Sequence, residues 1–168
     1  DAMAAAFVRS DLIYARDTWI RVERDLNDYA AAWARERVRN CDADAASPRE
    51  LVEVCLERRR VEFTSLVDVL ATGAPEVIER ARQAIQSLTP PAACRDSRLA
   101  ELEASLPLAD DPVIVSALRE RLSRSAAREL AGQYDAALAD LTALAGDITT
   151  VAYLPLTAEA ALLRGTIL

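Results

Sequence analysis

The helical spacing of its apolar residues is the feature that most constrains this chain. Between residues 12 and 33 they recur every three or four positions, which places them on one face of an α-helix. No segment has a long enough alternation of apolar and polar residues to indicate a half-buried strand. The sequence therefore predicts an all-α fold built on a first long helix whose buried face carries Leu12, Ala15, Trp19, Val22, Leu26, Tyr29 and Trp33.

Capping residues and prolines divide the chain into further helices. Ser10 is suited to cap the first helix, and Ser47 and Asp111 are suited to cap later ones, each being followed by a proline. Gly73 and Gly132 suit the left-handed position that ends a helix. We expect helices at residues 10–39, 48–72, 75–88, 98–106, 113–131 and 134–148, and a last one after residue 155.

The types of residue that are missing argue against an active site. All 20 basic residues are arginine, and histidine is absent. A histidine base, a Schiff-base lysine and a histidine metal ligand are thereby excluded. With only 4 glycines, the chain has little material for a glycine-rich phosphate loop. The 27 carboxylates are scattered, with no spacing that marks an acid and a base. We therefore expect no catalytic residue, no cofactor and no metal site.

Charge and hydropathy restrict the partners. The net charge of −7 argues against a nucleic-acid surface, which is normally basic. No apolar run is long enough to cross a membrane, so we expect no membrane contact by this segment. The first residues also lack the charged and apolar regions of a secretory signal peptide. A protein or peptide partner, or a second copy of the chain, is the expectation that remains.

Residues 125–138 resemble one helix pair of a tetratricopeptide repeat. Gly132 and Tyr134 match its turn, and Ala137 matches the small residue at which two helices cross closely. Arg121 and Arg128 depart from the pattern, since the family has large apolar or aromatic residues there. A second copy opens at residue 158. The resemblance implies antiparallel hairpins stacked into a right-handed superhelix, with a repeat-like module at 1–106 and the repeat region at 111–168.

Three further motifs are similar to a region that precedes such repeats in bacterial serine/threonine protein kinases of the myxobacterial type. They are Trp33-x-x-x-Arg37-x-x-x-Cys41, Cys55-Leu56-x-x-Arg59 and Leu88-x-Pro-Pro-x-x-Cys94. The resemblance implies a non-catalytic sensor or interaction segment of a large kinase, with the kinase domain upstream. It also implies an extracytoplasmic location if a membrane span separates the two, and a cytoplasmic one otherwise. None of the kinase's own motifs lies in this chain.

The three cysteines leave several states open. Cys41 and Cys55 flank the loop of an antiparallel hairpin, which favours a disulfide between them. Cys94 follows the third helix at the same pole and is a rival partner for Cys55. Three buried thiols in a reducing compartment are another reading. A zinc site would need a fourth ligand such as Asp42 or Asp44.

The arginine run at residues 58–60 and one face of the repeat helix are the candidate interaction features. The three arginines are expected to pair with acidic residues of neighbouring helices, although they could also grip a phosphate. Trp33 and Arg37, one turn apart, could form a stacked pair. Residues expected to face a peptide groove, or else to pack on the preceding helix, are Arg119, Leu122, Ser123, Ala126 and Glu129.

These observations favour a protein-interaction or sensor segment of a bacterial kinase. The alternatives are a tetratricopeptide scaffold or regulator without a kinase, and a small-ligand sensor domain with a pocket beside Trp19 or Trp33. Truncation of the second repeat also predicts an uncovered end that another copy could cover. Its residues are Leu162, Leu163, Ile167 and Leu168.

Overall fold

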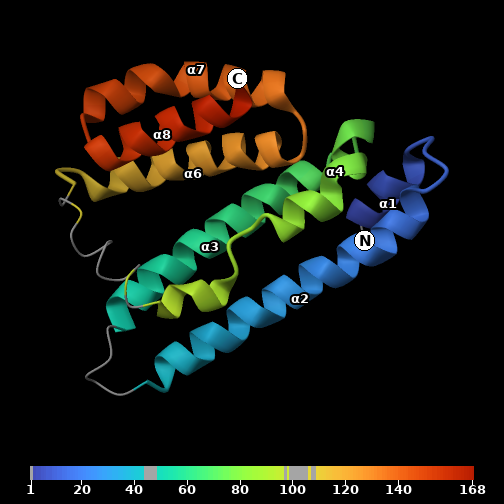
Figure 1. The fold of residues 1–168 in the computed structure, drawn as a ribbon, viewed down its shortest axis with the longest axis horizontal. Coiled ribbons are helices and arrows are strands. Elements are labelled where there is room, and N and C mark those ends of the chain that lie inside the picture. Colours follow the sequence, from blue (N-terminus) through green and yellow to red (C-terminus); the bar gives the residue numbers. More distant parts are fainter. Residues whose placement is uncertain (1, 44–48, 97, 99–105, 107–108) are drawn as a thin grey trace.

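The computed structural model describes residues 2–43, 49–96, 98, 106 and 109–168, and this part of the chain is all-helical, as predicted (Figure 1). It contains no strand within those ranges. The helix predicted at 98–106 lies almost entirely outside them, as does the predicted N-cap Ser47. The helices are α1 (Ala2–Arg9), α2 (Ala15–Cys41), α3 (Arg49–Leu70), α4 (Pro75–Gln86), the 3-10 helix η1 (Pro91–Arg95), α6 (Pro112–Leu130), α7 (Tyr134–Val151) and α8 (Leu154–Ile167).

Helix α2 buries the face that its apolar spacing predicted. Ala15, Trp19, Val22 and Leu26 lie in the main core, and Tyr29 and Trp33 further along are partly buried. Most other positions of α2 are exposed, whereas Glu36 and Asn40 near its end are buried. This helix packs on α3 and α4, whose buried apolar residues complete the core. The narrow apolar stripe of α2 therefore packs into the core that α2 shares with α3 and α4.

The chain before α2 forms a helix that the sequence did not predict. Helix α1 lies across the start of α2, and its Phe7 is fully buried with its ring centroid 5.3 Å from that of Trp19. Ser10 does not cap α2, which begins five residues later. Its hydroxyl instead donates to the carbonyl of Phe7 at 2.7 Å, closing the end of α1. A short helix of 8 residues has little intrinsic stability, so packing of Phe7 holds it in place.

The 3-10 helix η1 is tied to α2 by an ion pair. Glu36 is buried, and its carboxylate accepts hydrogen bonds from Arg95 of η1 and, at 2.8 Å, from Arg39. The hydrogen bond from Arg95 is the main reason that the pKa of the Glu36 carboxyl lies below its ordinary value, although burial opposes this shift. A second contact joins α2 to the connector before η1, since the hydroxyl of Tyr29 donates to the Thr89 carbonyl at 2.9 Å.

Replacement of Glu36 is expected to remove a stabilisation that depends on pH. A carboxyl whose pKa is lowered by folding stabilises the fold above its unfolded pKa, and this contribution is lost as the pH falls through the folded pKa. Glu36→Gln should lower the free energy of unfolding by about 1 to 2 kcal/mol at about pH 7, and by clearly less at about pH 3. Urea titrations at both pH values measure this. Glu23→Gln, on an exposed position of the same helix, is the control, and an equal loss at both pH values would contradict the assignment.

Helices α6, α7 and α8 form a second group with its own core. Asp111 caps α6 as predicted, because its carboxylate accepts from the amides of Val113 and Ile114. Gly132 ends α6 at a φ of +84°, and α7 returns antiparallel, with Ala137 fully buried. This core is made of Leu118, Leu122, Leu141, Leu144, Ile148 and Leu156.

The two groups join where α3 packs on α6. Figure 1 shows α3 between α2 and α6, with the last turns of α3 and α6 close together and their first turns further apart. Small residues allow the close approach, since Ala127 of α6 and its C-cap residue Ala131 belong to the core of the first group. Arg80 of α4 also lies over the Tyr134 ring, at 5.3 Å from its centroid.

The end of the chain is helical up to Ile167. Leu163 and Ile167 pack against the second core, whereas Leu162 and Leu168 are exposed. Only part of the apolar surface expected at this end is thus uncovered. The self-association inferred from it stays a prediction.

Candidate functional site

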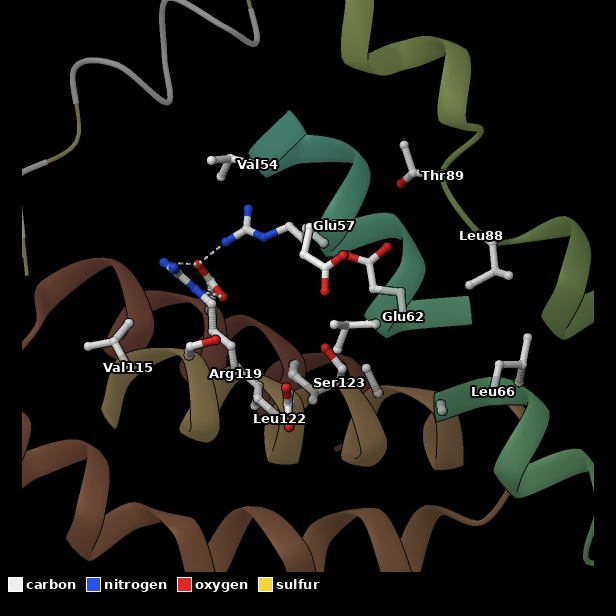
Figure 2. Close-up of a pocket in the computed structure, with 18 of the residues that line it drawn as sticks. Val54, Glu57, Glu62, Leu66, Leu88, Thr89, Val115, Arg119, Leu122 and Ser123 are labelled. Carbon is white, nitrogen blue, oxygen red and sulfur yellow. Dashed lines mark hydrogen bonds and ion pairs between the residues drawn. The ribbon is translucent and has the colours of Figure 1, made fainter. Parts of the chain in front are cut away.

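A cleft of about 1270 Å³ lies between α3 and α6, lined by residues from Glu50 to Leu66 and from Pro112 to Leu130. Figure 2 shows Val54, Glu57 and Glu62 of α3 on one side and Arg119, Leu122 and Ser123 of α6 on the other. Leu88 and Thr89 of the connector after α4 lie at one edge, and α8 contributes Glu159. The cleft follows from the divergence of α3 and α6 beyond their alanine-rich crossing.

The sides of α3 determine the character of the cleft. One side of the helix, including Leu56 and Leu70, is buried against the first group. Another side places Val54 and Val61 in the cleft, opposite Leu122 and Ala126 of α6. Val54 has no cover in the described part of the chain and is 58% exposed. Among the described residues, the floor of the cleft is therefore apolar and not fully covered.

A three-residue ion network connects the cleft walls. Glu159 of α8 accepts from Arg58 of α3 at 2.9 Å and from Arg119 of α6 at 3.1 Å. The Arg119 guanidinium also lies 5.6 Å from the centroid of the Tyr153 ring. About a third of each of the three paired side chains is exposed, so solvent screens the pairs. The network links α3, α6 and α8 at this end of the cleft.

Glutamates dominate the charged lining. The described residues of the lining include six glutamates and three arginines, Arg37, Arg58 and Arg119. Burial raises the pKa of Glu62, while the nearby Arg59 and Arg58 oppose this effect. The pKa of Glu57 is lowered, mainly by its hydrogen bond from Arg60. The cleft is thus an acidic groove with an apolar floor.

The three arginines at residues 58–60 all form ion pairs with glutamates of this chain. Arg58 pairs with the neighbouring helix α8, as expected. Arg59 and Arg60 pair instead within α3, with Glu62 at 2.9 Å and with Glu57. The stacked pair of Trp33 and Arg37 is present, with the guanidinium carbon 5.3 Å from the ring centroid.

Four of the five residues predicted to face a peptide groove line the cleft. Arg119, Leu122, Ser123 and Ala126 line the cleft, whereas Glu129 does not. Leu122 is also buried in the second core, so packing accounts for most of its contacts. The structure thus brings four of the five together, on the side of α6 that faces α3.

The favoured Cys41–Cys55 pairing is wrong in this structure, which has the rival pairing of Cys55 with Cys94. Cys55 is bonded to Cys94 of η1, with a Cα–Cα distance of 5.6 Å, and Cys41 is a free, exposed thiol. Arg49 at the start of α3 donates to the Cys41 carbonyl at 2.7 Å, which places Cys41 beside the first turn of α3. Cys55 lies six residues further on, about 9 Å along the helix axis. The described residues hold no group of three side chains able to ligate a metal, and Asp44 lies outside them.

Neither tryptophan is among the described residues that line the cleft, and the alternative of a small-ligand pocket beside one of them stays a prediction. Trp19 is buried in the core beside Phe7. Trp33 is partly buried, and its indole donates to the Leu56 carbonyl at 2.8 Å. Packing and one hydrogen bond account for both rings.

Sequence reasoning missed the acidic side of α3. Glu50, Glu53 and Glu57 follow each other at intervals of three and four, which places them on one helix face. All three line the cleft. The spacing was visible in the sequence, but only the tertiary structure shows that this face looks toward α6 and not toward open solvent.

No family model, curated protein or solved structure matches this chain. None of the helices in the described ranges has the length and apolarity to cross a membrane.

Proposed function

We propose that this chain is a non-catalytic interaction module that binds a peptide segment of a partner protein in the cleft between α3 and α6. The observation that carries the proposal is the apolar floor of this cleft, which the described residues do not fully cover. Its volume of about 1270 Å³ exceeds the range of about 300–1,000 Å³ that is usual for small-molecule pockets. A peptide is therefore a better match than a metabolite.

We further propose that α6 and α7 are one tetratricopeptide-type hairpin, and that the module serves a bacterial serine/threonine kinase. The Gly132 turn and the buried Ala137 support the repeat. The kinase connection is supported by the three motifs around Trp33, Cys55 and Cys94 and by no other observation. Sequencing of the parent gene upstream of Asp1 tests it. A kinase catalytic domain is expected there, and without one the module would be a scaffold of another kind.

A single arginine in the cleft should abolish peptide binding. Val54→Arg places a long charged side chain on the apolar floor, and because Val54 is exposed the fold should tolerate it. Binders are first selected from a displayed peptide library with the unchanged protein, and their affinity is then measured by fluorescence anisotropy. We expect a loss of at least about 1.4 kcal/mol of binding free energy, or tenfold in Kd.

The matched control for this variant is Val38→Arg. Val38 is 60% exposed on α2, nearly the same as Val54, and does not line the cleft. If the two substitutions change the Kd of the selected peptides equally, or if neither changes it, the binding surface lies elsewhere and the proposal is refuted.

A further inference from the structure

The charge of the cleft identifies the chemistry of its occupant. Four of the six glutamates among the described lining residues are paired with arginines, Glu53 with Arg37, Glu57 with Arg60, Glu62 with Arg59, and Glu159 with Arg58 and Arg119. Glu50 and Glu120 are both exposed and have no ion-pair partner in the described part of the chain. The cleft therefore carries a surplus of negative charge that a cationic ligand would neutralise.

The geometry of the glutamates indicates a helical ligand. Glu50, Glu53 and Glu57 of α3 repeat with the period of a helix and span about 10 Å, or two turns. Glu53 and Glu57 are already paired with Arg37 and Arg60, which leaves Glu50 on α3 and Glu120 on α6 free. A helix lying between α3 and α6 would place basic side chains of its two sides beside these two carboxylates. The cleft walls are themselves helices, and the described residues offer no strand edge that could pair with an extended peptide.

The floor requires that this helix be amphipathic. Val54 and Val61 on α3 and Leu122 and Ala126 on α6 form an apolar strip between the charged rims. A helix with apolar residues at intervals of three and four would cover this strip and direct its flanking charges toward the glutamates. Arginine matches a carboxylate with two hydrogen bonds, which makes it the preferred flanking residue.

We propose that the partner segment bound by this cleft is an amphipathic, arginine-rich helix. The inference rests on the proposed function, since it names the occupant of the same cleft. The predicted complex places the apolar face of the helix on Val54 and Leu122. Its arginines pair with the unpaired Glu50 on one side and with the unpaired Glu120 on the other.

The test uses the full chain and synthetic peptides of about 20 residues, long enough to form a helix. One peptide has leucines at helical spacing flanked by arginines, and a second has glutamate at every arginine position. A third has the composition of the first in an order without an apolar face. Anisotropy titrations at about 0.15 M salt should show binding of the arginine peptide, with the other two at least about tenfold weaker.

A charge-reversed variant makes the test specific to the cleft. Glu50→Arg with Glu120→Arg should weaken binding of the arginine peptide at least about tenfold and strengthen binding of the glutamate peptide. The control is Asp17→Arg with Glu23→Arg, which changes the net charge equally at exposed positions of α2 outside the cleft.

Three outcomes would overturn the inference. Equal effects of the two double variants would mean diffuse attraction to an acidic protein. Equal binding of the arginine peptide and its scrambled form would remove the need for an amphipathic helix. Binding of a glutamate or uncharged peptide in preference to the arginine peptide, lost in Val54→Arg but not in Val38→Arg, would reject the cationic partner. That last result would leave the proposed function intact, whereas library binders insensitive to Val54→Arg would reject both.

Discussion

Removal of the Cys55–Cys94 disulfide is expected to cause a large loss of stability. The bond joins α3 to η1 across 39 residues of sequence, so it closes a loop that contains the rest of α3 and all of α4. A cross-link over a loop of this length restricts the unfolded chain by about 4 kcal/mol in the loop-entropy treatment. Cys55→Ala with Cys94→Ala should lower the free energy of unfolding by about 2 to 4 kcal/mol.

Urea unfolding of oxidised protein measures this difference, and a reductant supplies an internal check. In excess dithiothreitol the disulfide is reduced, and the free energy of unfolding of the unchanged protein should fall close to that of the double variant. The control Cys41→Ala should change the free energy of unfolding by less than about 0.5 kcal/mol, since Cys41 is free and exposed. Alkylation of the oxidised protein should label Cys41 alone. Labelling of all three cysteines, or a loss below about 1 kcal/mol in the double variant, would contradict this bond.

Truncation of Phe7 is expected to release α1 from the bundle. The ring is fully buried against Trp19, and α1 is too short to persist without it. Phe7→Ala should lower the free energy of unfolding by about 3 to 5 kcal/mol. Because Phe7 is part of the cover of Trp19, the indole should become solvated, and its fluorescence should shift to longer wavelength.

The fluorescence is best measured in a Trp33→Phe background, so that Trp19 is the only tryptophan that emits. Val8→Ala is the matched control, because Val8 is the next residue of the same helix and is 59% exposed. Its effect should be less than about 0.5 kcal/mol. An unshifted Trp19 emission in the Phe7 variant would mean that α1 does not shield the core.

Local patterns were sufficient to predict most of the helices, because their period and their capping residues are short-range properties. Asp111 caps α6 and Gly73 takes a left-handed φ of +64°, both as their types predicted. The same reasoning failed for α1 and for Ser10. The eight residues of α1 carry no amphipathic repeat long enough to read, and their helical state depends on one ring packed against a distant residue.

The candidate cleft was only partly predictable. The face of α6 with Arg119, Leu122, Ser123 and Ala126 was identified from its position in a repeat, and it lines the cleft. The opposite wall depends on how α3 is rotated about its axis. Leu56 packs with Val52 and Cys94 and Val54 lines the cleft, although both are ordinary apolar residues in one helical run. The spacing of apolar residues does not predict which of these two sides of α3 is buried in a core and which lines the cleft.

The sequence by itself determined an acidic, all-helical chain without the residue types of most active sites. These properties follow from composition and from a spacing of three and four, which require no knowledge of distant contacts. The tertiary structure decided that Cys94, and not Cys41, meets Cys55, and that α3 and α6 diverge to leave an acidic cleft. Both depend on the relative placement of helices far apart in the chain, which is set by the packing of whole surfaces and not by any local pattern.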